Sequence, residues 1–176
     1  MAEETKNENW IKWVALTTTI LAVCAAIASL KGGGFSTQVQ VMTTQENNKW
    51  SYFQSKSIKQ HVSEMERDLY KLELVKSAAP AVTAEVQAKL KELEANIERY
   101  DKEKAQIKKE AEDLSAKQLE AKKHGGNFGM AVMFFQIAIM LSAIGSLLKQ
   151  RNFWLLGLLF GACGIVYFVN GFVTLF

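Results

Sequence analysis

Three long stretches of the chain contain no charged residue, and this feature restricts the fold more than any other. They are residues 13–30, 125–148 and 153–176. A helix of about 20 apolar residues is needed to cross about 30 Å of hydrocarbon. The charge lies elsewhere, since 17 of the 21 Lys and Arg residues fall between positions 31 and 123. We therefore expect an all-α membrane protein with three transmembrane helices.

The first apolar stretch also resembles a secretory signal peptide. Ala26-Ile27-Ala28 has the small residues at which such peptides are cleaved. A signal peptide begins with a basic segment, whereas three glutamates lie among the first eight residues here. We therefore predict a retained helix at 13–30, preceded by an N-terminal segment, 1–12.

The charged insert, 31–124, has the spacing of a helical hairpin. Apolar residues of its first half recur at alternating steps of four and three, as in a coiled coil, at Ile58, Val62, Met65, Leu69 and Leu72. The second half keeps one heptad register, broken only by Lys104 and Gln118, at Val86, Leu90, Leu93, Ile97, Tyr100, Ile107, Ala111, Leu114 and Ala121. Pro80 is the only proline, and proline ends one helix and suits the first turn of the next. We predict a long antiparallel coiled-coil hairpin with its tip at Pro80, rather than one continuous helix bent there.

The hairpin makes a geometric prediction. Its two apolar seams should meet in antiparallel order about Pro80. Leu72 should therefore lie near Leu90 or Leu93, and Val62 should lie near Tyr100.

Glycines flank the insert on both sides. The first span is followed by Lys31-Gly32-Gly33-Gly34, and the second span begins with Gly125-Gly126. Glycine has low helix propensity and leaves the backbone free to turn. We expect both segments to act as swivels, with the first ending the helix that contains 13–30.

Basic residues predict how the chain is inserted. The short loop 149–152 has two positive charges and no negative one, and the segment 1–12 contains two lysines. Basic residues of short loops tend to stay in the cytoplasm. Three lysines shortly before 125–148 oppose this orientation, but long translocated domains weigh less. We place the N-terminus and the loop in the cytoplasm and the hairpin outside, which in a bacterium is the periplasm.

The sequence contains few residues that are suited to catalysis. Its two histidines, His61 and His124, lie among charged residues, and we expect both to be solvated. No phosphate-binding glycine loop, paired metal-ligand spacing or nucleophile elbow is present. We therefore expect no enzyme activity, no cofactor, no metal and no nucleic-acid partner.

Inside the spans, small and polar residues are the candidates for function. Small residues that allow close helix packing, within one chain or between chains, are Ala22, Ala26, Gly157, Gly161 and Gly164. Polar residues that could bond across helices or line a pore are Thr17, Thr18, Thr19, Gln136 and Asn170. No ionisable Asp, Glu, Lys, Arg or His lies in a span, which disfavours a proton-coupled pump.

An aromatic motif interrupts the charged first arm. Its candidate contact residues are Trp50, Tyr52, Phe53, Gln54, Lys56 and Ser57. A solvated helix face does not need three aromatic rings. They either close the hairpin against its second arm or form a docking surface for a partner.

Three segments together resemble an uncharacterised family of bacterial membrane proteins, a domain of unknown function. They are Ala15 to Gly34, the Trp-x-x-Phe-Gln-x-Lys-Ser motif at 50–57, and Val166-Tyr167-Phe168-Val169-Asn170-Gly171-Phe172. Ser55 departs from the alanine usual in that family. The resemblance covers nearly the whole chain and implies a bacterial inner-membrane protein with three spans, without implying an activity.

Our hypothesis from sequence is a self-associating, membrane-anchored structural or interaction scaffold. Its partners would be the lipid bilayer, further copies of the chain and another membrane or periplasmic protein. The alternative is an oligomeric channel or transport subunit, because three spans are too few for a solitary transporter.

Overall fold

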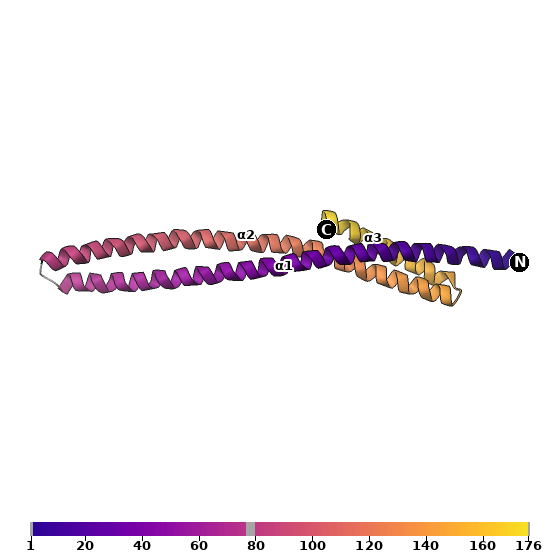
Figure 1. The fold of residues 1–176 in the computed structure, drawn as a ribbon, viewed down its shortest axis with the longest axis horizontal. Helices are drawn as coiled ribbons and strands as arrows, with labels where there is room; N and C mark the ends of the chain where they lie inside the picture. The colour runs from indigo at the N-terminus through magenta and orange to yellow at the C-terminus, as the bar shows by residue number, and fades with distance from the viewer. Residues whose placement is uncertain (1, 77–79, 176) are drawn as a thin grey trace. The chain divides into compact units, whose positions relative to one another are not determined.

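The computed structural model describes residues 2–76 and 80–175, and the side chains of 10–76 and 83–175. It contains three helices and, over this part of the chain, no strand. They are α1 (Ala2–Lys76), α2 (Pro80–Leu147) and α3 (Arg151–Val173), as Figure 1 shows. The predicted all-α class is confirmed.

All three helices contain a segment that is long and apolar enough to cross a membrane. The best windows have a mean hydropathy of 2.0 in α1, 2.0 in α2 and 1.9 in α3. The chain thus has the features of a multi-pass membrane protein.

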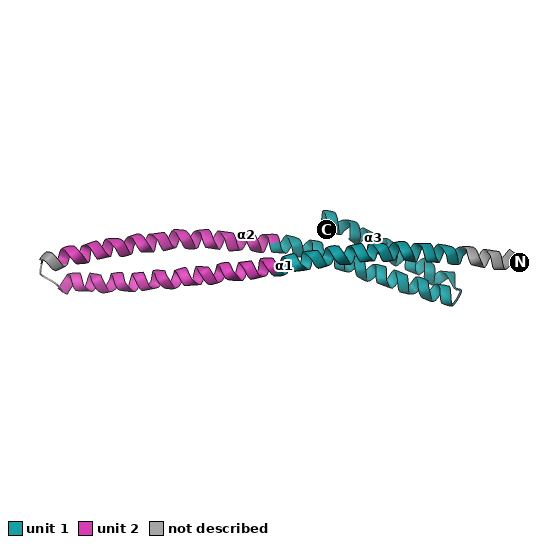
Figure 2. Ribbon diagram, viewed as in Figure 1, with its two compact units in different colours: residues 1–40, 118–176 teal, residues 41–117 magenta. Residues whose placement is uncertain are grey.

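The chain divides into two compact units (Figure 2). The membrane unit consists of residues 1–40 and 118–176, and the hairpin unit consists of residues 41–117. Helices α1 and α2 contribute to both units, whereas α3 belongs wholly to the membrane unit.

The flanking glycines do not interrupt the helices, and the prediction of swivels is wrong. Helix α1 continues through Gly32-Gly33-Gly34. The physical reason is close packing, because a Cβ atom on Gly32 would lie 3.3 Å from the Cβ of Phe128. Gly125 allows the same approach from α2, since a Cβ there would lie 3.3 Å from the Cβ of Phe35. Tertiary contact has overridden local propensity.

The core of the membrane unit combines aromatic rings with small residues. Its fully buried members are Ala28, Phe128, Ala131, Phe135 and Ala138, together with the nearly buried Leu21. Helix α3 contributes a glycine face to this core. A Cβ on Gly157 would lie 2.8 Å from the carbonyl oxygen of Ala138, and one on Gly164 would lie 2.7 Å from the ring of Phe135.

In the hairpin unit, the segments of α1 and α2 run in opposite directions. Lys49 pairs with Glu110, whereas Gln60, further along α1, bonds to Asp101, earlier on α2. Helix α2 begins at Pro80, and residues 77–79 lie outside the described chain. The contacts between the arms favour a hairpin over the single bent helix that was the competing interpretation.

The two helices present different faces to each other. Helix α2 buries part of its predicted seam, with Val86, Leu93, Ile107 and Ala111 all below 6% exposed. The inward face of helix α1 mixes polar residues with half-buried aromatic ones such as Phe53 and Tyr70. Its buried residues in this unit are Gln60, at 8% exposed, and Ser63, at 9%.

The predicted seam of the first arm is therefore wrong. Its five residues are all exposed, with values of 64% for Ile58, 49% for Val62, 68% for Met65, 64% for Leu69 and 57% for Leu72. Leu72 and Val62, which were expected to lie near Leu90 or Leu93 and near Tyr100, are 57% and 49% exposed. A heptad pattern shows that a helix has an apolar face but not which neighbour covers it.

Candidate interaction surfaces

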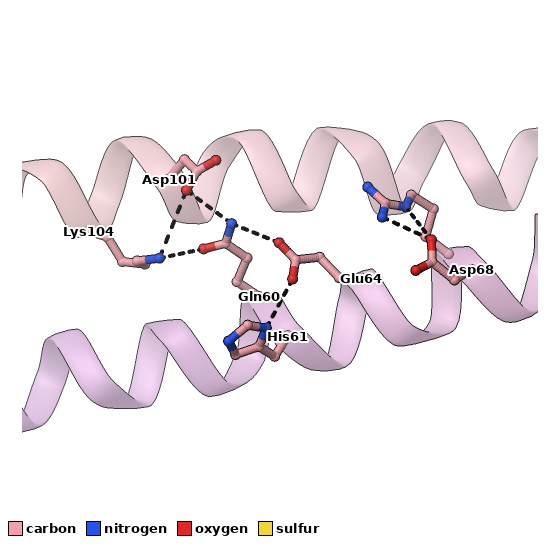
Figure 3. A network of polar contacts seen from close by, with 7 residues as sticks. Gln60, His61, Glu64, Asp68, Asp101 and Lys104 are labelled. Atoms are coloured by element: carbon pink, nitrogen blue, oxygen red, sulfur yellow. Dashed lines mark hydrogen bonds and ion pairs between the residues drawn. The ribbon is translucent and has the colours of Figure 1, made fainter.

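A polar network centred on Gln60 links the two arms (Figure 3). The amide nitrogen of Gln60 donates to Asp101 Oδ1 at 3.0 Å and to Glu64 Oε1 at 3.1 Å. Its amide oxygen accepts a hydrogen bond from Lys104 Nζ at 2.8 Å. A buried amide requires such partners. Because Gln60 meets two residues of α2 at once, the network favours one register of the arms.

Two ion pairs join the arms nearer to the start of the hairpin. Lys56 Nζ lies 2.6 Å from Glu103 Oε2, and Lys49 Nζ lies 2.5 Å from Glu110 Oε2. The hydrogen bond from Lys56 lowers the pKa of Glu103, and the same contact raises the pKa of Lys56. The hydrogen bond from Lys49 likewise lowers the pKa of Glu110. The Lys49–Glu110 pair is about 40% exposed and contributes little alone, whereas the Lys56 side chain is only 15% exposed.

Part of the aromatic motif faces the second arm. The Lys104 ammonium lies 5.5 Å from the ring centre of Phe53, and Lys56 lies 5.6 Å from that of Tyr100. Phe53, Lys56 and Ser57 are half-buried. These contacts support the interpretation that Phe53 and Lys56 close the hairpin.

The remaining motif residues are more open. Trp50 is half-buried and contacts its own helix, with its ring 5.7 Å from Phe53 and its indole N–H donating to Glu46 at 3.4 Å. Tyr52 is 49% exposed, and Gln54 is exposed. A docking role for Trp50 and Tyr52 stays a prediction.

The five exposed apolar residues of α1 form what we call the outward stripe: Ile58, Val62, Met65, Leu69 and Leu72. Their face lies opposite the one that holds Gln60, because the two sets are offset by half a helical turn. Helix α2 has no counterpart, since no large apolar residue is exposed anywhere in its described side chains from Thr83 to Lys117. The stripe is the main apolar surface that the hairpin unit leaves uncovered.

The small residues of the spans divide into two groups. Gly157, Gly161 and Gly164 are buried within the membrane unit, so their face packs inside one chain. Ala22 and Ala26 are exposed on α1.

The polar residues of the spans are satisfied locally, with one exception. Thr17, Thr18 and Thr19 donate to carbonyl oxygens of their own helix at 2.8 to 3.0 Å. Asn170 is 2% exposed, and its Oδ1 accepts from the backbone N–H of Leu175 at 2.7 Å. Gln136 is exposed on α2. Among these residues, Gln136 and Thr19 are exposed, and Thr19 bonds to its own helix.

Of the two histidines expected to be solvated, His61 is exposed and His124 is half-buried. His61 Nδ1 lies 3.0 Å from Glu64 Oε2, although the His61 ring is exposed. His124 Nδ1 donates to the carbonyl oxygen of Gly171 at 2.8 Å, and its ring stacks on Phe35 at 5.0 Å between centres. His124 therefore ties α2 to α3 within the membrane unit.

Comparison with known proteins shows the family. The family described as a domain of unknown function (DUF4337) matches residues 10–174, and the chain belongs to it. No curated protein and no solved structure matches the chain. In the described residues, no group of three or more His, Cys, Asp or Glu side chains could hold a metal ion.

Proposed function

We propose that this DUF4337 protein is a self-associating, membrane-anchored scaffold. The outward stripe is the observation that carries the proposal. Its residues are 49% to 68% exposed, and fully burying one large aliphatic side chain contributes about 1.5–3 kcal/mol. Contiguous exposed apolar surface of this kind marks an interaction site.

We further propose that the insert is an antiparallel coiled-coil hairpin on the periplasmic side of a bacterial inner membrane. The exposed Lys149 and Arg151 support a cytoplasmic loop between α2 and α3. The apolar seam of α2 and the cross-arm pairs support the coiled coil. We propose no catalytic activity for the chain.

A single charge substitution tests self-association. Met65→Glu places a carboxylate in the middle of the stripe, and because Met65 is 68% exposed the hairpin itself should not be disturbed. Ala95→Glu, on the exposed face of α2, is the matched control. We expect native mass spectrometry in lipid nanodiscs to show oligomers for the wild type and the control, and a shift toward monomer for Met65→Glu. A wild type that is monomeric at every concentration would contradict the proposal.

A channel or transport subunit is the second candidate, and exposed Gln136 favours it. An amide near the middle of a span is unfavourable against lipid, so it suits a polar contact or a water-filled path between copies. Gln136→Leu should then change ion conductance in planar bilayers. Conductance absent from wild-type protein would count against this candidate and leave the scaffold intact.

A further inference from the structure

The formal net charge of the chain, +3, belongs entirely to the membrane unit. The hairpin unit has 14 basic and 14 acidic residues, whereas the membrane unit has seven basic and four acidic ones. From position 9 to position 45, and from position 121 to the end, the sequence contains no Asp or Glu. The excess positive charge therefore flanks the segments that are apolar enough to cross a membrane, where lipid headgroups lie.

The short turn between α2 and α3 (Figure 1) brings two of these charges together. Lys149 and Arg151 are both exposed. Every ion pair between described side chains lies in the hairpin unit. Within the described part of the chain, the two basic side chains of the turn thus have no acidic partner.

Hydrogen bonds fix the backbone of this turn. The N–H of Lys149 donates to the carbonyl oxygen of Ser146 at 3.3 Å, and that of Gln150 donates to Gly145 at 2.9 Å. These are the two bonds of a Schellman motif. Lys149 has a φ of 52°, at the position where this motif favours glycine. The turn therefore has a lysine where the backbone alone would favour a residue without a side chain.

The helix dipoles explain only one of the two charges. A cation is favourable at the C-terminal end of a helix and unfavourable at the N-terminal end. Lys149 follows the end of α2, whereas Arg151 is the first residue of α3. An anion bound at the turn would offset the unfavourable position of Arg151.

Tryptophan rings position the guanidinium of Arg151. It lies 5.7 Å from the ring centre of Trp10, which is 5% exposed and lies 6.3 Å from the ring of Trp154. The indole N–H of Trp154 donates to Thr17 Oγ1 at 3.2 Å, which joins α3 to α1. Tryptophan favours the headgroup level of a bilayer, and the planar guanidinium suits a phosphate group. The rings thus hold Arg151 at the depth of the lipid phosphates.

The acidic residues of the membrane unit lie elsewhere along the helices. Glu3, Glu4 and Glu8 precede Trp10, on the part of α1 that continues away from the apolar segment. Glu120 precedes the apolar segment of α2, at the end opposite to the turn.

We propose that the turn between α2 and α3 binds the phosphate of an anionic phospholipid through Lys149 and Arg151. Exposed leucines beside the turn provide the apolar contact for the acyl chains: Leu147, Leu148 and Leu155. A free phosphate ion would lack that contact, so a lipid is the fitting ligand. This site does not require self-association of the chain.

Spin-label electron paramagnetic resonance of the full chain in phosphatidylcholine bilayers tests the site. The ratio of the association constants of spin-labelled phosphatidylglycerol and phosphatidylcholine measures the preference for an anionic headgroup. We expect the wild type to prefer phosphatidylglycerol, and Lys149→Gly with Arg151→Gln to lower this preference about fivefold. Glycine suits the backbone at position 149, so the loss would not come from a damaged turn. A wild type without any preference would overturn the proposal.

Lys122→Gln with Lys123→Gln is the matched control. It removes the same charge from the opposite end of the apolar segment of α2, where both lysines are exposed. The preference should change little. Equal losses in the two double variants would show a general attraction between a basic protein and an anionic bilayer, and would overturn the site.

Trp10→Leu separates position from charge, because it leaves both basic residues in place. We expect it to lower the preference about twofold, and Trp10→Phe, which keeps an aromatic ring, to retain most of it. An unchanged preference in Trp10→Leu would mean that the guanidinium is not held for the lipid, contrary to the proposal. Inorganic phosphate at constant ionic strength should not displace the labelled lipid. Full displacement would identify the turn as a site for a free anion and reject the lipid.

Discussion

The membrane unit and the hairpin unit pack their helices in different ways. In the membrane unit, glycines of α3 let the helices approach until aromatic rings such as Phe135 are fully buried. In the hairpin unit, α2 packs its apolar seam against a mixed face of α1, on which the buried residues are Gln60 and Ser63. The first unit closes its core within one chain, and its exposed apolar residues lie on segments apolar enough to cross a membrane. The second leaves an apolar stripe outside, and that difference directs attention to the hairpin as the site of partner contact.

The difference also lies in what fixes the register of the helices. Ring and glycine shapes interlock in the membrane unit, where Phe128 packs beside Phe168 and Phe172 at 6.0 and 5.0 Å between ring centres. In the hairpin unit, hydrogen bonds and ion pairs between specific residues fix the register of the helices. The bond between Gln60 and Lys104 is the most enclosed example. Shape contacts are insensitive to pH and salt, whereas charge contacts are not.

We expect Gly157→Ala to lower the stability more than any other change, because it disrupts the close contact between α3 and α2 in the membrane unit. The added Cβ would lie 2.8 Å from the rigid carbonyl oxygen of Ala138. We expect a loss of about 3 kcal/mol in unfolding free energy, the upper range for overpacking. Denaturation of the protein in mixed detergent micelles measures it.

Gly129→Ala is the matched control for that substitution. A Cβ on Gly129 would have no neighbour within 4 Å, so the change should stabilise the helix by up to about 1 kcal/mol. Equal effects of the two substitutions would show that close approach of α3 to α2 is not what stabilises the unit.

Phe53→Ala and Trp50→Ala should separate the two roles of the aromatic motif. Phe53 contacts Lys104 of α2, so its removal should loosen the hairpin by about 1–2 kcal/mol, less than for a fully buried ring. Limited proteolysis of residues 41–117 would then be faster with oligomer size unchanged. Trp50→Ala should instead weaken assembly while the hairpin stays protected. Faster proteolysis for Trp50→Ala with unchanged oligomer size would remove the docking role.

Much of the fold could be predicted from the sequence because lipid imposes a strong rule. Charge is costly in hydrocarbon, so the uncharged runs predicted three helices able to span a membrane, and the structure confirms their length and composition. The prediction that the glycines at 32–34 end the first helix was wrong. Their low helix propensity can be read from the sequence, whereas their close neighbour, Phe128, cannot.

The prediction of which residues form the interface between the arms failed for a related reason. The apolar spacing of α1 predicted a face correctly but not its partner. One signal could have located that partner, since Lys104 interrupts the apolar seam of α2 and a polar residue there requires a polar neighbour. Reflection about Pro80 gives Lys56, one helical turn before Gln60, which does bond to Lys104. Matching polar interruptions across a hairpin therefore carries information that apolar periodicity alone lacks.

The smallest effect we expect is a pH dependence confined to the hairpin unit. The hydrogen bond from Lys56 lowers the pKa of Glu103 below 4.5, and the one from Lys49 does so for Glu110. A carboxyl whose folded pKa is depressed stabilises the fold above its unfolded pKa, and this contribution is lost as the pH falls through the folded value. The arms should therefore separate more often below pH 4.5 than at pH 7.

Spin labels on exposed Ser55 and Ala105 can follow this separation by pulsed dipolar spectroscopy. We expect the distance distribution to broaden modestly on acidification, because solvent-exposed pairs contribute little each. The double variant Glu103→Gln, Glu110→Gln should be slightly broadened at pH 7 and show much less change with pH. A wild-type distribution that stays constant down to pH 3 would mean that the apolar seam of α2 holds the arms without the charge pairs, which would erase the contrast between the two units.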